Sequence, residues 1–179
     1  MEWLKQLDIA VFRTVHVDWH RDWLNPVFWL ITSTGLGHIQ VLGLLIVSRL
    51  AEYKAYVPPL LAAFLLTGAT NLAMKQLLPR ERPSWLVWAS PRETAFYDSF
   101  PSGHSVTSFG IAITLLLLTR GTSHSRLGWT AVFWAALVGY SRLYQGVHWA
   151  TDVLAGAAIG LFWACVIVLF KSKRASTAA

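Results

Sequence analysis

The sequence predicts an all-α integral membrane protein: a polytopic helical bundle with about five spanning helices and one amphipathic helix at the membrane surface. Two observations lead to this class. Hydrophobic residues make up 55% of the 179 residues and charged residues 13%, a balance typical of membrane proteins. Long apolar stretches also follow one another along the chain, at 26–50, 56–78, 102–119, 127–140 and 149–170. Because a span needs about 20 mostly apolar residues, the fourth stretch spans only if it includes its flanks.

Residues 1–22 differ from the rest, because charged side chains are interspersed there with Trp, Leu, Ile, Val and Phe. The segment is too polar to span, and it lacks the apolar core of a signal peptide. We expect an amphipathic helix in the membrane interface, and packing of the same helix on the rest of the protein is equally compatible. The expected organisation is this helix over 1–22, a membrane core over 23–170 and a basic tail over 171–179.

Local signals shape the spanning stretches. The run 32–38, rich in glycine and hydroxyl side chains, favours a kink or a close helix contact in the first stretch. His38 ends this run, and both a structural and a cavity-lining role stay open for it. The prolines at 58–59 suit the first turn of the second helix, and Pro79 ends that helix. The small residues of 156–160 favour close packing of the last helix.

The segment 79–101 is the long connection of the chain. Long loops in compact proteins are usually functional, for example as lids. Its aromatic residues suit the membrane interface, so we expect an active-site cap there. The prolines and aromatic residues of this segment are Pro79, Pro83, Pro91, Pro101, Trp85, Trp88, Phe96, Tyr97 and Phe100.

Charge and cysteine content narrow the function classes. The formal net charge of +6 is compatible with nucleic-acid binding, but its distribution favours a membrane protein without a nucleic-acid partner. The single cysteine, Cys165, excludes an intrachain disulfide and a zinc site built from thiolates.

The distribution of charge also predicts the topology. With five spans, one membrane face receives the N-terminal segment, the loop 79–101 and the turn 141–152, which together hold eight of the nine acidic residues. Of the eight basic residues on that face, four belong to the site described below. The positive-inside rule then makes the other face cytoplasmic. That cytoplasmic face holds Glu52 and the basic residues Arg49, Lys54, Arg120, Arg126, Lys171, Lys173 and Arg174.

Three polar clusters interrupt the apolar pattern, and the first is Lys75 with Arg80 and Arg82. A lysine in the last turn of a span commonly extends its ammonium group to the membrane surface, and this is the plain structural explanation. The functional explanation is an anion clamp, in which lysine supplies a point charge and arginine a planar fork for phosphate oxygens.

The second cluster is Ser102-Gly103-His104, which follows Pro101 and precedes an apolar helix. This pattern is typical of a helix start. The free N–H groups there form an anion site, and Gly103 would let an oxyanion approach the backbone. His104 would lie in the first turn, where it could transfer a proton to a leaving oxygen. A simple helix cap beside a surface histidine is the structural alternative.

The third cluster holds Arg142, His148 and Asp152 at the start of the last apolar stretch. Ionisable residues at a membrane boundary are costly and therefore functional candidates. On a helix, positions 148 and 152 share one face, so that the carboxylate can orient the imidazole. Span parity brings all three clusters to the same membrane face. Cationic clamps with a nucleophile and an acid are the groups that phosphoryl transfer requires.

The three clusters resemble the signatures of the type 2 phosphatidic acid phosphatase superfamily. These are Lys, six residues and Arg-Pro; Pro-Ser-Gly-His; and Ser-Arg, three residues, Gly, one residue, His, three residues and Asp, all complete within 75–152. The resemblance implies a helical core and His148 as a nucleophile that forms a phosphohistidine. It implies that Asp152 orients His148, and that His104 protonates the leaving oxygen and then activates water.

The resemblance also implies a phosphate site without a metal or another cofactor. The residues that it assigns to binding the phosphoryl group are Lys75, Arg82, Ser102, Gly103 and Arg142. Arg80 is a candidate for contact with a second phosphate. The expected partners are a lipid substrate drawn from the bilayer and the membrane lipids themselves, and the oligomeric state is open.

The chain is similar to the small bacterial membrane members of the superfamily. We therefore expect a multi-pass protein of the bacterial inner membrane whose site faces the extracytoplasmic side. The favoured substrate is undecaprenyl diphosphate, with phosphatidylglycerophosphate or phosphatidic acid as alternatives. A vanadium haloperoxidase would share the anion clamp, but the apolar stretches count against a soluble enzyme. A proton-coupled transporter would explain the intramembrane charges and remains a more distant hypothesis.

Overall fold

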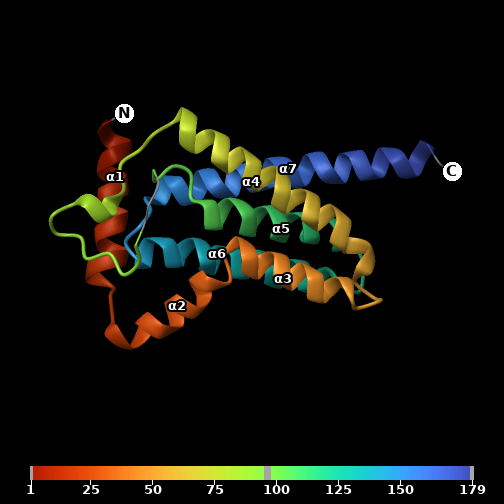
Figure 1. Ribbon diagram of the computed structural model, residues 1–179, viewed down its shortest axis with the longest axis horizontal. Coiled ribbons are helices and arrows are strands. Elements are labelled where there is room, and N and C mark those ends of the chain that lie inside the picture. Colours follow the sequence, from red (N-terminus) through yellow and green to blue (C-terminus); the bar gives the residue numbers. More distant parts are fainter. Residues whose placement is uncertain (1, 95–97, 178–179) are drawn as a thin grey trace.

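The computed structural model describes residues 2–94 and 98–177, and Figure 1 shows its arrangement. Within these residues the chain forms helices and turns, and no strand is present. The long helices run along the long axis of the molecule, and α1 lies across one end. The helices are α1 (Glu2–Arg13), α2 (Asn25–Ser33), α3 (Gly37–Ser48), α4 (Val57–Leu77), α5 (Gly103–Thr119), α6 (Ser125–Tyr144) and α7 (Ala150–Thr177). Shorter helical turns cover Thr14–Asp18, Asp22–Leu24, Lys54–Tyr56 and Pro83–Trp85.

The prediction of an all-helical membrane protein is confirmed, whereas the predicted number of spans is not established. Within the described part of the chain, two helical segments are long and apolar enough to cross a membrane, Lys54–Leu77 and Ala150–Lys173. A third span results if α2 and α3 are counted as one broken helix. Helix α5 is apolar but has only 17 residues, and α6 reaches 20 residues by including the flanks of its apolar stretch. Five spans therefore remain a prediction.

The predicted kink in the first apolar stretch is present. Helices α2 and α3 meet at a bend of 62° at the break that contains Gly35. A Cβ atom on Gly35 would come within 2.6 Å of the ring carbon Cδ2 of His104. Glycine at this break therefore lets the first turn of α5 pack closely against the bend.

Helix α5 lies at the centre of the bundle and packs against α4, α6 and α7. The small residues of α7 allow a close approach, as the run 156–160 predicts. A Cβ atom on Gly160 would lie 2.6 Å from the backbone nitrogen of Gly110, and one on Gly156 would lie 2.8 Å from Cβ of Ser105. This packing brings the first turns of α5 and α7 to the same end of the molecule (Figure 1).

The N-terminal segment packs on the rest of the protein with one side and leaves apolar side chains exposed on the other. Asp8 and Phe12 of α1 are buried, as are Val15 and His16 of the following turn, so the segment packs on the rest of the protein. Trp3 and Leu7 are exposed on its other side. An exposed apolar face beside a packed one is compatible with a helix in the membrane interface.

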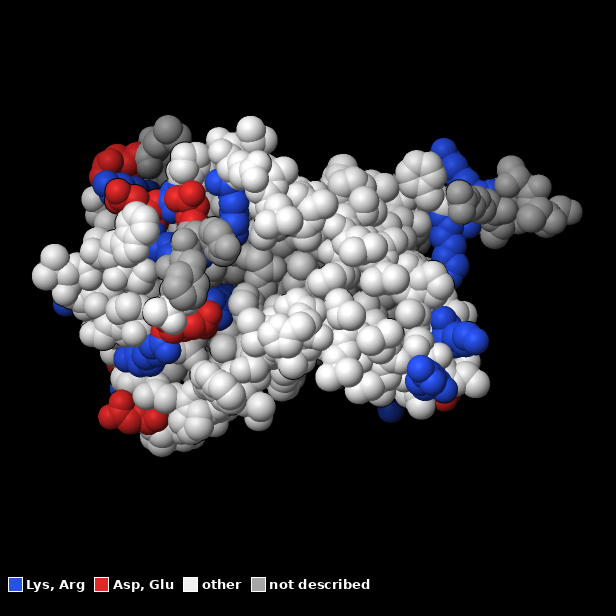
Figure 2. All heavy atoms as spheres, in the orientation of Figure 1, with Lys and Arg blue, Asp and Glu red and all other residues white. Residues whose placement is uncertain are grey.

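The charged side chains visible in Figure 2 gather at the two ends of the molecule, and uncharged residues cover the middle. The end near α1 carries both acidic and basic side chains, whereas Lys and Arg dominate the opposite end. This is the distribution expected of a protein whose middle lies in a bilayer. At the C-terminal end, α7 continues through Thr177, so most of the predicted tail 171–179 is helical and residues 178–179 lie outside the described part.

Candidate active site

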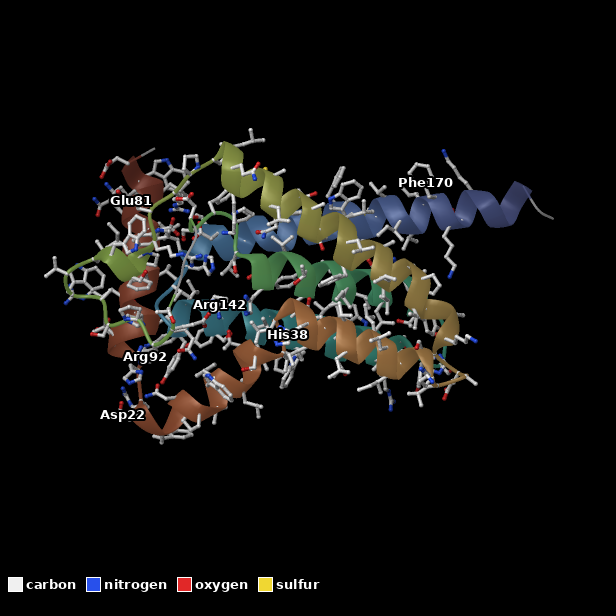
Figure 3. All side chains as sticks on the ribbon, in the orientation of Figure 1. Asp22, His38, Glu81, Arg92, Arg142 and Phe170 are labelled. Atoms are coloured by element: carbon white, nitrogen blue, oxygen red, sulfur yellow. The ribbon has the colours of Figure 1, made fainter. Side chains whose placement is uncertain are left out.

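The three predicted clusters meet at the end of the bundle that α1 covers. Lys75 lies in the last turn of α4 and Arg142 in the last turn of α6, while His104 and Asp152 lie in the first turns of α5 and α7. His148 lies in the connection between α6 and α7. Figure 3 shows Arg142 inside this end of the bundle.

His148 and Asp152 form a buried dyad. Nδ1 of His148 lies 3.4 Å from Oδ2 of Asp152, and both side chains are almost fully enclosed. The same carboxylate oxygen accepts hydrogen bonds from the hydroxyl of Ser99 and from the backbone N–H of Trp149, the latter at 2.9 Å. These contacts fix the carboxylate against one nitrogen of the imidazole. They favour the tautomer that carries its proton on Nδ1, which leaves Nε2 with a lone pair.

The second ring nitrogen of His148 faces a cation. Nη1 of Arg82 donates to Nε2 of His148 at 3.2 Å and to the carbonyl oxygen of Val147 at 2.8 Å. Burial is the main cause that lowers the pKa of His148, to about 4, and the nearby Arg142 and Arg82 lower it further against the opposing effect of Asp152. At neutral pH the imidazole is therefore neutral, as a nucleophile must be.

Lys75 and Arg82 converge on one backbone carbonyl. Nζ of Lys75 donates to the oxygen of Asp98 at 2.5 Å, and Nη2 of Arg82 donates to the same oxygen at 3.2 Å. Asp98 belongs to the predicted cap segment, which therefore contacts the first cluster. Burial and the neighbouring Arg142 lower the pKa of Arg82. The arrangement concentrates positive charge beside His148.

The second cluster lies against the dyad through its backbone. The N–H group of Ser102 donates to the carbonyl oxygen of Asp152 at 3.2 Å, and the hydroxyl of Ser102 accepts from Ser105 at 3.0 Å. A Cβ atom on Gly103 would lie 3.2 Å from Nδ2 of Asn71, a tight contact that favours glycine. Among the described residues, Nε2 of His104 is buried without a hydrogen-bond partner. Such a group in a native protein commonly awaits a ligand or water.

Arg142 is paired with an acid of the cap segment. Its side chain is 3% exposed, and its two terminal nitrogens donate to the two carboxylate oxygens of Glu93 at 2.7 and 2.9 Å. Nη1 also donates to the hydroxyl of Thr32. Among the described residues, Nε of Arg142 is buried without a partner. The carboxylate of Glu93 thus lies in the fork that the family resemblance assigns to a phosphoryl group.

Arg80 lies between two carboxylates. Nη1 donates to Oδ1 of Asp152 at 2.6 Å and to the hydroxyl of Thr151 at 2.7 Å, while Nη2 donates to Oδ2 of Asp8 at 2.6 Å. Asp8 comes from α1, far from the three clusters in sequence. These hydrogen bonds do not test whether Arg80 also binds a second phosphate, so that contact stays a prediction.

Comparison with known proteins identifies the family. The family model described as the PAP2 superfamily matches residues 57–176, which is most of the chain and contains all three clusters. The chain belongs to the PAP2 superfamily. This confirms the resemblance carried by the three sequence signatures.

Relatives of this PAP2 protein carry several names, among them undecaprenyl-diphosphatase and phosphatidylglycerolphosphate phosphatase. It is 36% identical over 112 residues to an undecaprenyl-diphosphatase of Sulfolobus acidocaldarius, a match over 62% of this chain and 50% of that protein. The crystal structure of Aquifex aeolicus LpxE matches with a TM-score of 0.80 and 26% identity, over 90% of this chain and 94% of that one. A transmembrane PAP2-type phosphatidylglycerolphosphate phosphatase from Bacillus subtilis matches with a TM-score of 0.82 and 26% identity, over 97% and 88%. The protein is therefore a multi-pass membrane protein of a phosphatase family.

Several residues around the PAP2 signatures were not predicted from the sequence. Ser99 and Glu93 lie in the cap segment, where no motif singles them out. Thr32 belongs to the hydroxyl-rich run of the first apolar stretch, for which the sequence predicted a kink or a close helix contact and not the hydrogen bond with Arg142. Asp8 lies on the buried side of α1, and an acid among buried apolar neighbours was a usable signal.

Other residues that the sequence singled out can be located or not as follows. His38 is exposed at the start of α3, and Figure 3 shows it outside the cluster around Arg142. The aromatic residues Phe96 and Tyr97 of the predicted cap lie outside the described residues. Within residues 2–94 and 98–177, no group of three or more His, Cys, Asp or Glu side chains is arranged to hold a metal ion.

Proposed function

We propose that this protein removes a phosphate from a lipid phosphate or diphosphate through a phosphohistidine on His148. The observation that carries the proposal is the environment of that imidazole: Asp152 faces Nδ1 at 3.4 Å and Arg82 faces Nε2 at 3.2 Å. A histidine that a carboxylate orients on one side, and that faces on the other a guanidinium able to turn to a phosphoryl oxygen, has the geometry of an activated nucleophile.

In the proposed first step, the lone pair of His148 Nε2 attacks phosphorus and the bond from phosphorus to the leaving oxygen breaks. His104, protonated when the anionic substrate is bound beside it, gives its proton to that oxygen and becomes neutral. In the second step, His104 takes a proton from water, the water oxygen attacks phosphorus, and the nitrogen–phosphorus bond breaks to release inorganic phosphate. Preorganised cations stabilise the charge that develops on the phosphoryl oxygens in both steps. The groups proposed to do so are Lys75, Arg82, Arg142, Ser102 and the N–H of Gly103.

The proposal of a lipid substrate is supported by a groove that extends along the bundle from the bend between α2 and α3. An apolar groove of about 400 Å³ is lined by residues of α3, α5 and α6 and includes Thr34 at the bend. The neighbouring Gly35 packs against His104. A hydrocarbon chain in this groove would leave its phosphate near the first turn of α5.

Undecaprenyl diphosphate is the favoured substrate, and phosphatidylglycerophosphate or phosphatidic acid is the second candidate. Relatives with the names undecaprenyl-diphosphatase and phosphatidylglycerolphosphate phosphatase support these two options. We place the site on the extracytoplasmic side of a bacterial inner membrane, because basic residues dominate the opposite end of the molecule. Activity without a metal is part of the proposal, since side-chain cations supply the clamp.

The deciding experiment is phosphate release by the purified protein in detergent, with the candidate lipids and with pyrophosphate as a soluble comparison. Rapid quenching with a phosphorus-labelled lipid should leave label on the denatured wild-type protein and none on His148→Ala. His38→Ala is the matched control, because it removes an exposed histidine outside the cluster. Retention of label and activity in His148→Ala would refute the mechanism. Loss of activity with EDTA that magnesium restores would refute metal independence.

A further inference from the structure

Helix α1 places a buried carboxylate at the start of α7. The side chain of Asp8 is 2% exposed. Its Oδ1 accepts the backbone N–H of Thr151 at 2.9 Å, and its Oδ2 accepts the hydroxyl of Thr151 at 2.5 Å. Since α7 begins at Ala150, this N–H belongs to the first turn, whose donors lack partners within the helix. Asp8 therefore caps α7 from a helix that lies more than a hundred residues earlier in the chain.

Arg80 connects this cap to the dyad. One terminal nitrogen donates to Asp8 and the other to Oδ1 of Asp152, each at 2.6 Å. The opposite oxygen of Asp152, Oδ2, faces His148. The carboxylate of Asp152 thus has one oxygen for Arg80 and one for the imidazole.

Because the guanidinium group of Arg80 is rigid, its contact with Asp8 also fixes how it faces Asp152. The group is planar, so two anchors on different nitrogens define its orientation. Without Arg80, the carboxylates of Asp8 and Asp152 would be buried near each other with no cation between them, which is strongly unfavourable. Without the charge on Asp8, Arg80 would lose one of its two anchors and could turn away from Asp152.

We propose that Asp8 and Arg80 are positioning residues, which hold Asp152 and the first turn of α7 so that Oδ2 stays against His148. Helix α1 is then part of the catalytic arrangement and not only a membrane-surface element. The inference rests on the proposed function, because it takes His148 and Asp152 as the reacting dyad. It also gives Arg80 a role other than contact with a second phosphate.

The test measures kcat and KM of the full-length protein in detergent with one lipid monophosphate and one lipid diphosphate. Asp8→Asn and Arg80→Gln should each lower kcat roughly 10- to 100-fold on both substrates, the effect typical of a misplaced reacting group. KM should change less than about twofold, because neither residue touches the substrate. Glu2→Gln is the matched control: it neutralises an exposed acid of the same helix, and its kinetics should equal those of the wild type.

The pH profile separates positioning from a general loss of folded protein. The charged or titratable groups that interact with His148 are Asp152, Arg82, Arg142 and His104. Removing the nearby positive charge in Arg80→Gln should move the acid limb of kcat/KM to higher pH, and removing the negative charge in Asp8→Asn should move it to lower pH. A smaller fraction of folded enzyme moves neither limb.

The outcomes are distinct. Wild-type kcat in both Asp8→Asn and Arg80→Gln would overturn the proposal, as would an increase of KM confined to the diphosphate in Arg80→Gln, which would favour the second-phosphate contact. If Asp8→Asn does not fold, Thr151→Val decides, because it removes the shared hydroxyl at nearly constant volume. Its kcat should fall in the same way, and a wild-type value would overturn the proposal. If the wild-type protein hydrolyses neither lipid, the proposed function itself fails.

Discussion

Neutralising Glu93 should make this enzyme bind its substrate more tightly. Glu93 has no role in the proposed reaction. Its carboxylate, however, accepts two hydrogen bonds from the guanidinium of Arg142, at 2.7 and 2.9 Å. A phosphoryl group that binds Arg142 must first displace it. The observed affinity is then the intrinsic affinity multiplied by the fraction of molecules in which the fork is open.

The size of the effect follows from the two contacts. Hydrogen bonds to charged groups contribute about 1.5–3 kcal/mol each when both partners are enclosed. Arg142 is 3% exposed, but the side chain of Glu93 is 33% exposed, so solvent and the ordering of the loop reduce the net value. A net preference of about 1–2 kcal/mol for the paired form corresponds to a factor of about 5 to 30. Glu93→Gln should therefore lower KM for the lipid by that factor.

The assay compares KM and the inhibition constant of orthovanadate, because vanadate is a phosphate analogue that needs no leaving group. Both should fall in Glu93→Gln by similar factors, with little change in kcat. Glu81→Gln is the matched control, since it removes the same charge from an exposed side chain of the same loop. Unchanged constants in Glu93→Gln, or an equal decrease in Glu81→Gln, would refute displacement of Glu93 as a step in binding.

Three further predictions concern the acid, the pH range and the topology. His104→Ala should lower kcat by about 10²–10⁴-fold for an alkyl phosphate and much less for an activated aryl phosphate; equal losses would remove His104 from the role of acid. Because burial lowers the pKa of His148 to about 4, the nucleophile is neutral above that value, and kcat/KM should persist to about pH 5 and fall below it. An acid limb near the ordinary value of 6.5 would contradict this. In a background without Cys165, a cysteine at Ser90 should react with an impermeant thiol reagent in intact cells and one at Ser123 should not; the reverse would place the site in the cytoplasm.

The fold class and the location of the site were predictable from the sequence for physical reasons. Apolar stretches of about 20 residues leave helices as the simplest way to satisfy the backbone in a bilayer. Alternation of spans brings every second connection to the same face. The structure accordingly brings Arg82 into contact with His148, and His148 into contact with Asp152, although the first of these contacts joins residues 66 positions apart.

The contacts between the cap, α1 and the dyad were not predictable in the same way. Ser99 and Glu93 act through a loop whose path depends on tertiary packing, and neither residue belongs to a periodic pattern. Asp8 is different, because it lies at i, i+4, i+7 and i+8 spacing with Phe12, Val15 and His16, all buried. That spacing defines one face of a helix. An acid on this face predicts a buried partner, even though the sequence does not identify Arg80 as that partner.

The predictions for Glu93→Gln and Asp8→Asn differ because the two carboxylates hold cations with different roles. Two of the cations donate to the neutral carbonyl oxygen of Asp98, which a phosphate can replace without competing charge. Arg142 is held by Glu93, whose charge must be displaced, whereas Arg80 is held by Asp8, whose charge keeps it directed at the dyad. The same change from acid to amide should therefore have opposite consequences: at position 93 it lowers KM and spares kcat, and at position 8 it lowers kcat and spares KM. A general electrostatic effect of added positive charge near an anionic substrate would lower KM at both positions, so the contrast between them tests the geometry and not only the charge.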